Sequence, residues 1–390
     1  MGFLDGVKVV DFTHAYAGPF CSLFLADYGA EVIKIERVDG GDQARTWGPF
    51  KNDYSAYYAS FNRGKKSITL DIKSPEGQKI IYDLIKDADI VCSNFKAGTL
   101  ERYGVGYEQM KQVKPDIIYA TISGFGTKGE LSKYAAYDNV IQAMSGVMDV
   151  NGFSDKGPTK IGPAIGDSYT GLLLLLGLMI AFYHKQKTGQ GQQIDVTTLG
   201  ALFGLLEYPV LEYANNGKVL TRSGNASHYV APSDIYKTKD DYIAITVKND
   251  SQWKTFCEIL HLDDTEEYAT NQQRLDKQHI LKTQIEEKLA AYTSKEAEAL
   301  FDYTEIAASS VMGIAESLEN PHLLARNMVI EVQDPVMGPV KLVGNPIHLS
   351  ENEPITNVPS PTLGEHTDDI LHQLGYTEEK IKELREAKVI

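Results

Sequence analysis

Residues 7–36, VKVVDFTHAYAGPFCSLFLADYGAEVIKIE, decide the fold of this chain. Residues 7–12 form an apolar run typical of a short strand, and residues 17–30 show the pattern of an amphipathic helix. Residues 31–36 alternate apolar and charged side chains, as a second strand does. The stretch therefore predicts a strand–helix–strand unit.

The same alternation recurs downstream. Further strands are expected at 67–72, 89–95 and 116–124, and helices at 75–88, with Pro75 in the first turn, and at 101–115. Strands that alternate with helices predict an α/β fold, a doubly wound parallel sheet with helices on both faces.

The pattern changes after Asn216. Residues 233–248, SDIYKTKDDYIAITVK, predict a hairpin, and charged amphipathic helices follow it. We therefore expect a large domain over residues 1–219 and a smaller α+β domain over 220–325. A C-terminal segment, 326–390, is expected to return to the large domain.

Composition narrows the class of protein. The formal net charge is −15 over 390 residues, and no basic block offsets it, which argues against a nucleic-acid partner. The cysteines Cys21, Cys92 and Cys257 are odd in number and far apart. With no signal-peptide pattern at the start, they predict reduced thiols in a cytoplasmic protein. The apolar run 171–183 is too short for a bilayer span and predicts a buried helix, so no membrane partner is expected.

Asp167 is the most informative single residue. It stands in KIGPAIGDSYTG, between a Gly-rich turn and a long apolar helix. One interpretation is a helix N-cap, in which the carboxylate accepts a hydrogen bond from a free backbone N–H group. The other is a nucleophile, with its backbone freed by Gly166, that attacks an activated acyl group. The isolated residue does not decide between them.

Three cations follow successive expected strands, namely Arg37, Lys73 and Arg102. The carboxyl ends of parallel strands converge on one crevice, where such cations suit a phosphate-bearing ligand. The alternative is that they are solvated surface charges.

Other motifs are weak. Gly124, Gly126 and Gly129 match a dinucleotide fingerprint, but a polar loop follows them instead of an apolar helix, which favours a loop beside a site. The nine histidines and three cysteines show no metal-ligand spacing, so no metal is expected. No Gly-x-Ser-x-Gly elbow is present, which argues against a serine hydrolase.

Taken together, the chain resembles the class III CoA-transferases of the CaiB/BaiF type, which include formyl-CoA transferase and carnitine-betaine CoA-transferase. The resemblance runs nearly end to end. It is carried by VVDFTHAYAGPFCSLFLADYGAEVIKIER, SITLDIKSPEG, SNFKAGTLERYG, YDNVIQAMSG and GDSYTG. Further support comes from KTGQGQQIDV, SLENPHLLARNMV, GPVKLVGNPIHLS and LGEHTDDIL.

The resemblance implies a Rossmann-like large domain, a small domain, and a homodimer of two chains threaded as interlocked rings. It implies that Asp167 is the catalytic nucleophile and that Tyr137 and Asp138 form an aromatic–acid pair in the substrate pocket. The positions that would contact coenzyme A are Ala15, Tyr16, Arg37, Leu70, Lys73, Asn94, Phe95 and Arg102. No permanently bound cofactor is implied, since the coenzyme A thioester is the substrate.

Two departures refine this implication. Acyl-CoA racemases on the same fold carry a histidine base where this chain has Tyr137, and tyrosine is a poor base at neutral pH. Formyl-CoA transferases have a run of glycines after their GNA segment, where this chain reads GNASHYVAPSD, which argues against formate and oxalate.

We therefore expect an acyl-CoA:carboxylate CoA-transferase of EC 2.8.3 type. It would work through an aspartyl–acyl anhydride and an aspartyl-CoA thioester at Asp167, with an acyl-CoA donor and a carboxylic acid acceptor as partners. The first backbone N–H groups of the Asp167 helix are expected to stabilise the oxyanions. The alternatives are an acyl-CoA racemase or epimerase and a non-catalytic CoA-ester-binding protein.

Overall fold

The computed structural model describes residues 2–263 and 265–390, and the chain divides into two compact units. The first unit consists of Met1–Val147, Ile161–Glu207 and Pro321–Ile390, and the second of Met148–Lys160 and Tyr208–Asn320. The limits of these compact units are not those of the expected domains, which were placed at residues 219 and 325. The expected domain boundaries stay a prediction.

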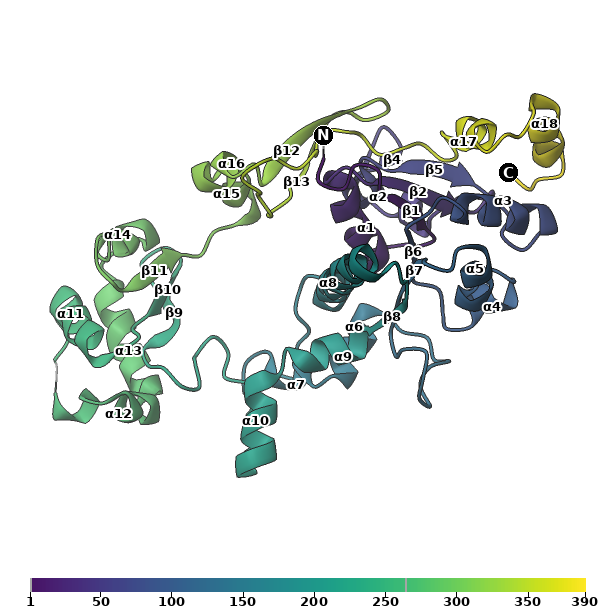
Figure 1. Ribbon diagram of the computed structural model, residues 1–390. Helices are drawn as coiled ribbons and strands as arrows, with labels where there is room; N and C mark the ends of the chain where they lie inside the picture. The colour runs from purple at the N-terminus through teal and green to yellow at the C-terminus, as the bar shows by residue number, and fades with distance from the viewer. Residues whose placement is uncertain (1, 264) are drawn as a thin grey trace. The chain divides into compact units, whose positions relative to one another are not determined.

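A six-stranded, all-parallel sheet forms the centre of the first unit (Figure 1). In order across the sheet its strands are β5 (Lys66–Thr69), β2 (Glu31–Glu36), β1 (Lys8–Asp11), β6 (Ile90–Ser93), β7 (Ile118–Ser123) and β8 (Gln193–Thr197). The order reverses between β1 and β6, where a doubly wound sheet opens a crevice for ligands. The predicted α/β class and parallel sheet are confirmed.

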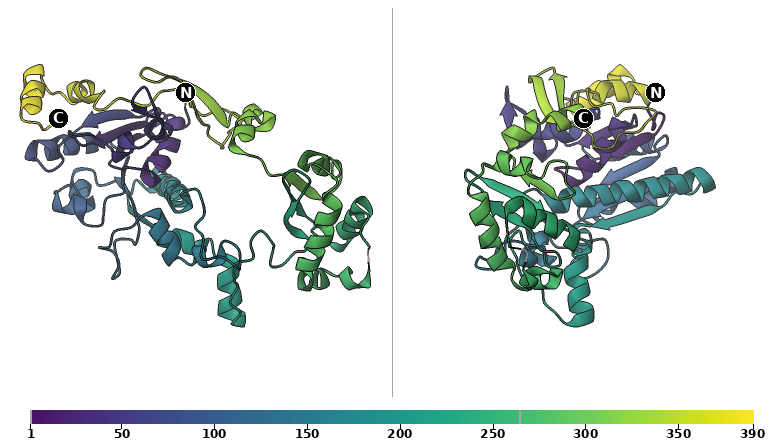
Figure 2. Two further views of the ribbon diagram at one scale, coloured as in Figure 1. Left: turned by 180° about the vertical axis from the view of Figure 1, so that it is seen from behind. Right: turned by 90° about the vertical axis from the view of Figure 1, so that its left-hand side faces the viewer.

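Apolar side chains project from both faces of the sheet, because successive strand residues point to opposite sides. On one face Val9 and Val32 pack in a cluster with α1 (Ala17–Asp27) and α8 (Ile165–Thr188). On the other face Val10 and Ile33 pack in a cluster with α3 (Pro75–Ile85) and α5 (Tyr107–Val113). Helix α8 lies beside α1 in every view (Figure 2).

The C-terminal segment closes the second of these clusters. Helices α17 (Thr367–Gln373) and α18 (Glu378–Glu386) contribute Ile370 and Leu384 to it. The backbone N–H of Asp71 donates to the carbonyl of Val389 at 2.7 Å, so the end of the chain is tied to the loop after β5. The remaining elements of the first unit are η1 (Gln43–Thr46), β3 (Phe50–Lys51), β4 (Tyr54–Ser55), α2 (Ala56–Asn62), α4 (Thr99–Arg102), α6 (Asp138–Met144), α9 (Thr198–Gly204), α16 (Pro321–Ala325), β12 (Val329–Asp334) and β13 (Gly338–Val343).

The second unit has its own core around Trp253 and Phe256. Its antiparallel sheet has the order β11 (Ala307–Ser310), β10 (Tyr242–Thr246), β9 (Ser233–Lys237), and β9 and β10 form the predicted hairpin. Its helices are α11 (Asp250–Leu260), η2 (Glu266–Tyr268), α12 (Asn271–Asp276), α13 (Gln278–Leu289), α14 (Ser294–Ala299) and α15 (Ile314–Glu319). Two short helices, α7 (Val147–Val150) and α10 (Glu207–Asn216), begin at the ends of first-unit segments.

Helix α8 departs from the expected buried helix. It spans 24 residues and, in the described part of the chain, it is the one helix long and apolar enough to cross a membrane by length and composition. Leu174, Leu178 and Ala181 are fully buried against α1 and the sheet, so this helix is an element of the first unit. Only one face is covered. Leu176 and Ile180 are 57% and 62% exposed on the other.

Candidate functional site

A cavity of about 480 Å³ lies in the first unit, where the order of the sheet reverses. The loop after β1, the ends of β6 and β7, and the first turns of α6 and α8 line it. Its walls are His14, Ala15, Tyr16, Ala17, Arg37, Gln43, Trp47, Tyr57, Asn94, Phe95, Ile122, Ser123, Gly124, Ala136, Tyr137, Asp138, Ile141, Ala164, Asp167 and Thr198. This is the location that parallel-sheet topology favours for ligand binding.

The loop after β1 is clamped to the loop after β6. The Asn94 side chain accepts a hydrogen bond from the His14 backbone N–H at 2.9 Å and donates to the His14 carbonyl at 2.7 Å. The ring of Phe95 meets the His14 ring edge-on, with centroids 5.4 Å apart. Asn94 therefore fixes the backbone from which Ala15 and Tyr16 face the cavity.

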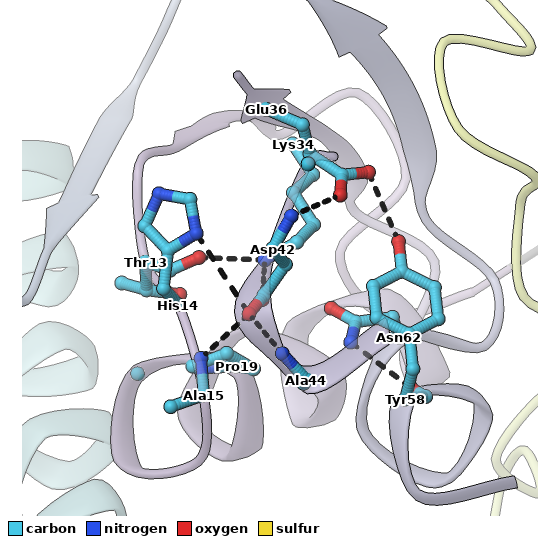
Figure 3. Close-up of polar contacts among 12 residues, drawn as sticks. Thr13, His14, Ala15, Pro19, Lys34, Glu36, Asp42, Ala44, Tyr58 and Asn62 are labelled. Carbon is cyan, nitrogen blue, oxygen red and sulfur yellow. Dashed lines mark hydrogen bonds and ion pairs between the residues drawn. The ribbon is translucent and has the colours of Figure 1, made fainter. Parts of the chain in front are cut away.

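A buried charged network lies beneath this loop (Figure 3). Lys34 and Asp42 form an ion pair of 2.8 Å, and neither side chain is exposed. Burial raises the pKa of the Asp42 carboxyl, but Lys34 and the hydrogen bonds outweigh it and hold that pKa well below its usual range. Glu36 is bound by Arg45 through two guanidinium nitrogens at 2.8 and 2.7 Å. Burial alone raises the pKa of Glu36, yet these partners lower it to about 2.

Asp167 lies in the first turn of α8, where it is the third helical residue. The N-cap is Ala164, which has no side-chain oxygen, so the N-cap interpretation of Asp167 is wrong. In residues 2–263 and 265–390 we find no group that donates a hydrogen bond to the Asp167 carboxylate. Burial, and next the charge of Asp138, raise its pKa to about 6. The site therefore keeps an unpartnered carboxylate that is costly to ionise.

Asp138 supplies the cap that Asp167 does not. Its Oδ1 accepts a hydrogen bond from the Gly166 backbone N–H at 2.8 Å, and its Oδ2 from Gln142 Nε2 at 2.7 Å. A Cβ on residue 166 would lie 2.7 Å from Asp138 Oδ1, so glycine is needed there. Fully buried Gln142 also accepts from the Ile161 N–H at 2.9 Å, which holds the loop before α8. Asp138 and Gln142 together fix the start of the helix that carries Asp167.

Three backbone N–H groups at this helix start already have acceptors within the protein, and the oxyanion role of the helix start stays a prediction. The backbone N–H of Ile165 donates to the Pro163 carbonyl, and that of Ser168 donates to the Ala164 carbonyl. Since Asp138 takes the Gly166 N–H, these three groups are already used within the protein.

Sequence reasoning named Tyr16 but missed two other aromatic residues of the cavity wall, Trp47 and Tyr57. Tyr16 packs against Phe61 with ring centroids 4.4 Å apart, and Trp47 meets Tyr57 edge-on at 5.5 Å. Burial, then the neighbouring Tyr16 and Asp167, raise the pKa of Tyr57 to about 12. Trp47 and Tyr57 come from a segment, residues 43–61, that has no clear helix or strand period. Only its density of aromatic residues could have indicated a binding wall.

The predicted site residues divide into two groups. Ala15, Tyr16, Arg37, Asn94, Phe95, Tyr137, Asp138 and Asp167 line the cavity, and Tyr137 is 70% exposed. Leu70 does not line it, because its side chain is 2% exposed in the core beneath the sheet. Lys73 and Arg102 also lie outside the cavity lining, on the exposed surface.

Lys73 contacts the end of the helix that carries Arg102. The Lys73 ammonium lies over the ring of Tyr103, 5.6 Å from its centroid, and Tyr103 follows Arg102 in the chain. The segments after β5 and β6 therefore meet outside the cavity. Arg37 stands at the cavity itself, with its Nε donating to the Gly41 carbonyl at 3.1 Å.

The glycine-rich segment at 124–129 is not followed directly by a helix, as a dinucleotide fingerprint would be. Gly126 and Gly129 have positive φ angles of 85° and 94°, and α6 does not begin until Asp138. Gly124 lines the cavity, so the motif forms a loop beside the site. Among the described residues no group of three or more His, Cys, Asp or Glu side chains could hold a metal ion.

Comparison with known proteins identifies the class of this site. The sequence profile of CoA-transferase family III matches residues 4–367, and the chain belongs to that family. It is 36% identical over 392 residues to succinyl-CoA:glutarate CoA-transferase from Homo sapiens, covering 99% of this chain and 90% of that one. It is 35% identical over 388 residues to succinyl-CoA:mesaconate CoA-transferase from Haloarcula hispanica, covering 96% and 97%.

A solved structure agrees with these relatives. The CaiB/BaiF family protein from Brucella suis superposes with a TM-score of 0.86 at 34% identity, covering 96% of this chain and 99% of that one. The protein is therefore a CoA-transferase enzyme that acts on coenzyme A thioesters, as the sequence predicts.

Proposed function

We propose that the protein exchanges coenzyme A between an acyl-CoA donor and a carboxylic acid by covalent catalysis at Asp167. The observation that carries this proposal is the Asp167 carboxylate in the wall of the cavity, which has a raised pKa and no hydrogen-bond donor among the described residues. A carboxylate without hydrogen-bonded partners keeps its lone pairs available for attack.

The reaction would proceed in four balanced steps. An Asp167 oxygen attacks the donor thioester carbonyl and the C–S bond breaks. Coenzyme A thiolate is expelled, and an aspartyl–acyl anhydride is formed. The thiolate attacks the aspartyl carbonyl, which gives an aspartyl-CoA thioester and frees the donor acid. The acceptor carboxylate then attacks that thioester and expels the thiolate, forming a second anhydride. Thiolate attack on the acceptor's acyl carbonyl releases the new acyl-CoA and restores Asp167.

Water must be kept from these intermediates, since hydrolysis would lose the thioester energy. Trp47 and Tyr57 support this requirement, because their rings line the cavity that holds the carboxylate, and Phe61 packs behind Tyr57. Coenzyme A would enter past Arg37, with Lys73 and Arg102 outside the cavity available to its phosphates.

We propose a dicarboxylic acyl group as the substrate class. Three of the relatives are named for succinyl-CoA as donor and for glutarate, mesaconate or D-citramalate as partner acid. A panel that pairs succinyl-CoA and acetyl-CoA with these acids and with the monocarboxylic acids acetate and butyrate, with chromatographic detection of the acyl-CoA products, tests this. Exchange confined to monocarboxylic acids would contradict it.

Racemisation is the competing chemistry on this fold. Tyr137 lines the cavity at the position where the racemases carry a histidine base, and tyrosine as a residue type is a poor base at neutral pH. A chiral 2-methylacyl-CoA should therefore not exchange its α-proton in deuterated water. Rapid deuterium incorporation at that carbon would favour the racemase.

We also propose a homodimer of interlocked rings in the cytoplasm. Supporting this, Leu172, Leu176, Ile180 and Tyr183 are 40–66% exposed at helical spacing on one face of α8, which gives an apolar surface a second copy could cover. Light scattering should give twice the chain mass of 43.2 kDa. A monomer at micromolar concentration would contradict the dimer.

A further inference from the structure

We propose that Asp42 is a positioning residue for this reaction, which holds the loop after β1 in the shape that receives coenzyme A. The inference rests on the proposed binding of coenzyme A at Ala15 and Tyr16. It goes beyond that proposal by assigning a role to a fully buried side chain beneath the loop.

The loop needs support because Ala15 has a left-handed backbone, with φ at 68°. A residue with a Cβ adopts this region only at a conformational cost, so surrounding contacts must impose it. The Ala15 backbone N–H donates to Asp42 Oδ1 at 3.0 Å, and the Ala44 N–H donates to the same oxygen at 2.9 Å. One carboxylate oxygen therefore joins the β1 loop, which carries Tyr16, to η1, which carries Gln43.

The second oxygen of Asp42 fixes the carboxylate itself. It pairs with the Lys34 ammonium at 2.8 Å, and Lys34 also donates to the Thr13 carbonyl at 2.6 Å. The Asp42 backbone N–H donates to Glu36 Oε2 at 2.9 Å. Figure 3 shows Asp42 between Ala15 and His14 on one side and Lys34 and Glu36 on the other. Two residues of β2 thus transmit the rigidity of the sheet to the loop.

Asp42→Asn tests this role, because asparagine has one acceptor oxygen where two are used. Either the backbone amides or the Lys34 ammonium must then face an NH₂ group. We expect the affinity for coenzyme A, measured by calorimetry, to fall by about tenfold. This factor corresponds to the conformational cost of a left-handed non-glycine residue, which the Asp42 contacts would no longer offset.

Asp27→Asn is the matched control. Asp27 forms a buried pair with Arg63 at 2.7 Å and does not line the cavity, so this change removes a comparable ion pair. It should lower thermal stability and leave coenzyme A affinity at the wild-type value. Equal loss of affinity in both variants would show that Asp42 has only a structural role.

Ala15→Gly supplies a readout that general destabilisation does not move. Glycine adopts a positive φ without the Cβ penalty, so Asp42→Asn should cost at least threefold less affinity in the Ala15→Gly background than in the wild type. Equal costs in the two backgrounds would overturn the proposal.

If Asp42→Asn does not fold, Asp42→Glu keeps the charge opposite Lys34 while displacing the oxygen from the Ala15 amide. It should bind coenzyme A more weakly, and wild-type affinity would also overturn the proposal. Binding is measured without turnover. A wild type that binds coenzyme A but forms no aspartyl adduct would therefore refute the proposed mechanism and not the role of Asp42.

Discussion

Replacing Asp167 with asparagine should make the protein more stable at neutral pH while abolishing turnover. Asparagine has nearly the same shape as aspartate and no charge. Burial, with the Asp138 charge, raises the pKa of Asp167 from 3.8 to about 6. That difference corresponds to about 3 kcal/mol of unfavourable ionisation in the folded state. Because water still reaches part of the carboxyl group, we expect a gain of about 1–3 kcal/mol.

The gain should depend on pH in a defined direction. Above pH 6 the carboxyl is ionised in both the folded and the unfolded chain, so the full cost is present and the variant gains most. Below the unfolded value of 3.8 it is protonated in both states, and the gain disappears. Urea unfolding of both proteins at pH 7.5 and at pH 4 measures this difference.

A control variant separates this effect from helix electrostatics. Glu76 is an exposed acidic residue in the first turn of α3. Glu76→Gln should be neutral or slightly destabilising, since a carboxylate near a helix N-terminus is favourable. If Asp167→Asn were less stable than the wild type at pH 7.5, the account of Asp167 as a carboxylate that burial makes costly to ionise would be refuted.

The other predictions concern binding, rate and assembly. Arg37→Ala should weaken coenzyme A binding by roughly one to two orders of magnitude, equally for different acyl groups; unchanged affinity by calorimetry would remove Arg37 from the site. The single-turnover rate of thiolate release should fall as pH decreases through about 6, because Asp167 must be ionised to attack; a rate that does not change between pH 5 and pH 8 would contradict this. Gln142→Ala should lower kcat by about tenfold with little effect on coenzyme A affinity, because Asp138 loses a donor and the start of α8 shifts; a change in affinity alone would contradict it. Ile180→Glu should prevent the dimer, and a dimer of wild-type stability by light scattering would place the interface elsewhere.

The fold was largely predictable because its signals are local. Strand and helix periods in residues 7–36 and 67–124 are set by side chains that point to known faces, and the structure confirms the parallel sheet. The strand at 31–36 shows the limit of this reasoning. Its alternation of apolar and charged residues predicted a strand but not the place of the charges, and Lys34 and Glu36 are buried in ion pairs. Their partners, Asp42 and Arg45, come from η1 and its N-cap position, and pairing of that kind has no sequence period.

The site was predictable only in part for the same reason. Asp167 was recognisable from its place at a helix start, but the carboxylate that caps this start is Asp138 on another helix, 28 residues before Gly166 in sequence. Lys73 and Arg102 do follow strands as expected. Their side chains nevertheless lie outside the cavity, because strand order fixes where a loop begins and not where its side chains point.

Mass spectrometry of Asp167 after incubation with succinyl-CoA tests the central claim most directly. Peptides from protein quenched during turnover should carry a coenzyme A or acyl adduct on Asp167, and hydroxylamine should convert it to the hydroxamate. Adding an acceptor acid should discharge the adduct at the rate of product formation, and Asp167→Asn protein should carry none. Full CoA exchange by wild-type protein with no adduct on Asp167, or with the same exchange rate in Asp167→Asn, would contradict the account.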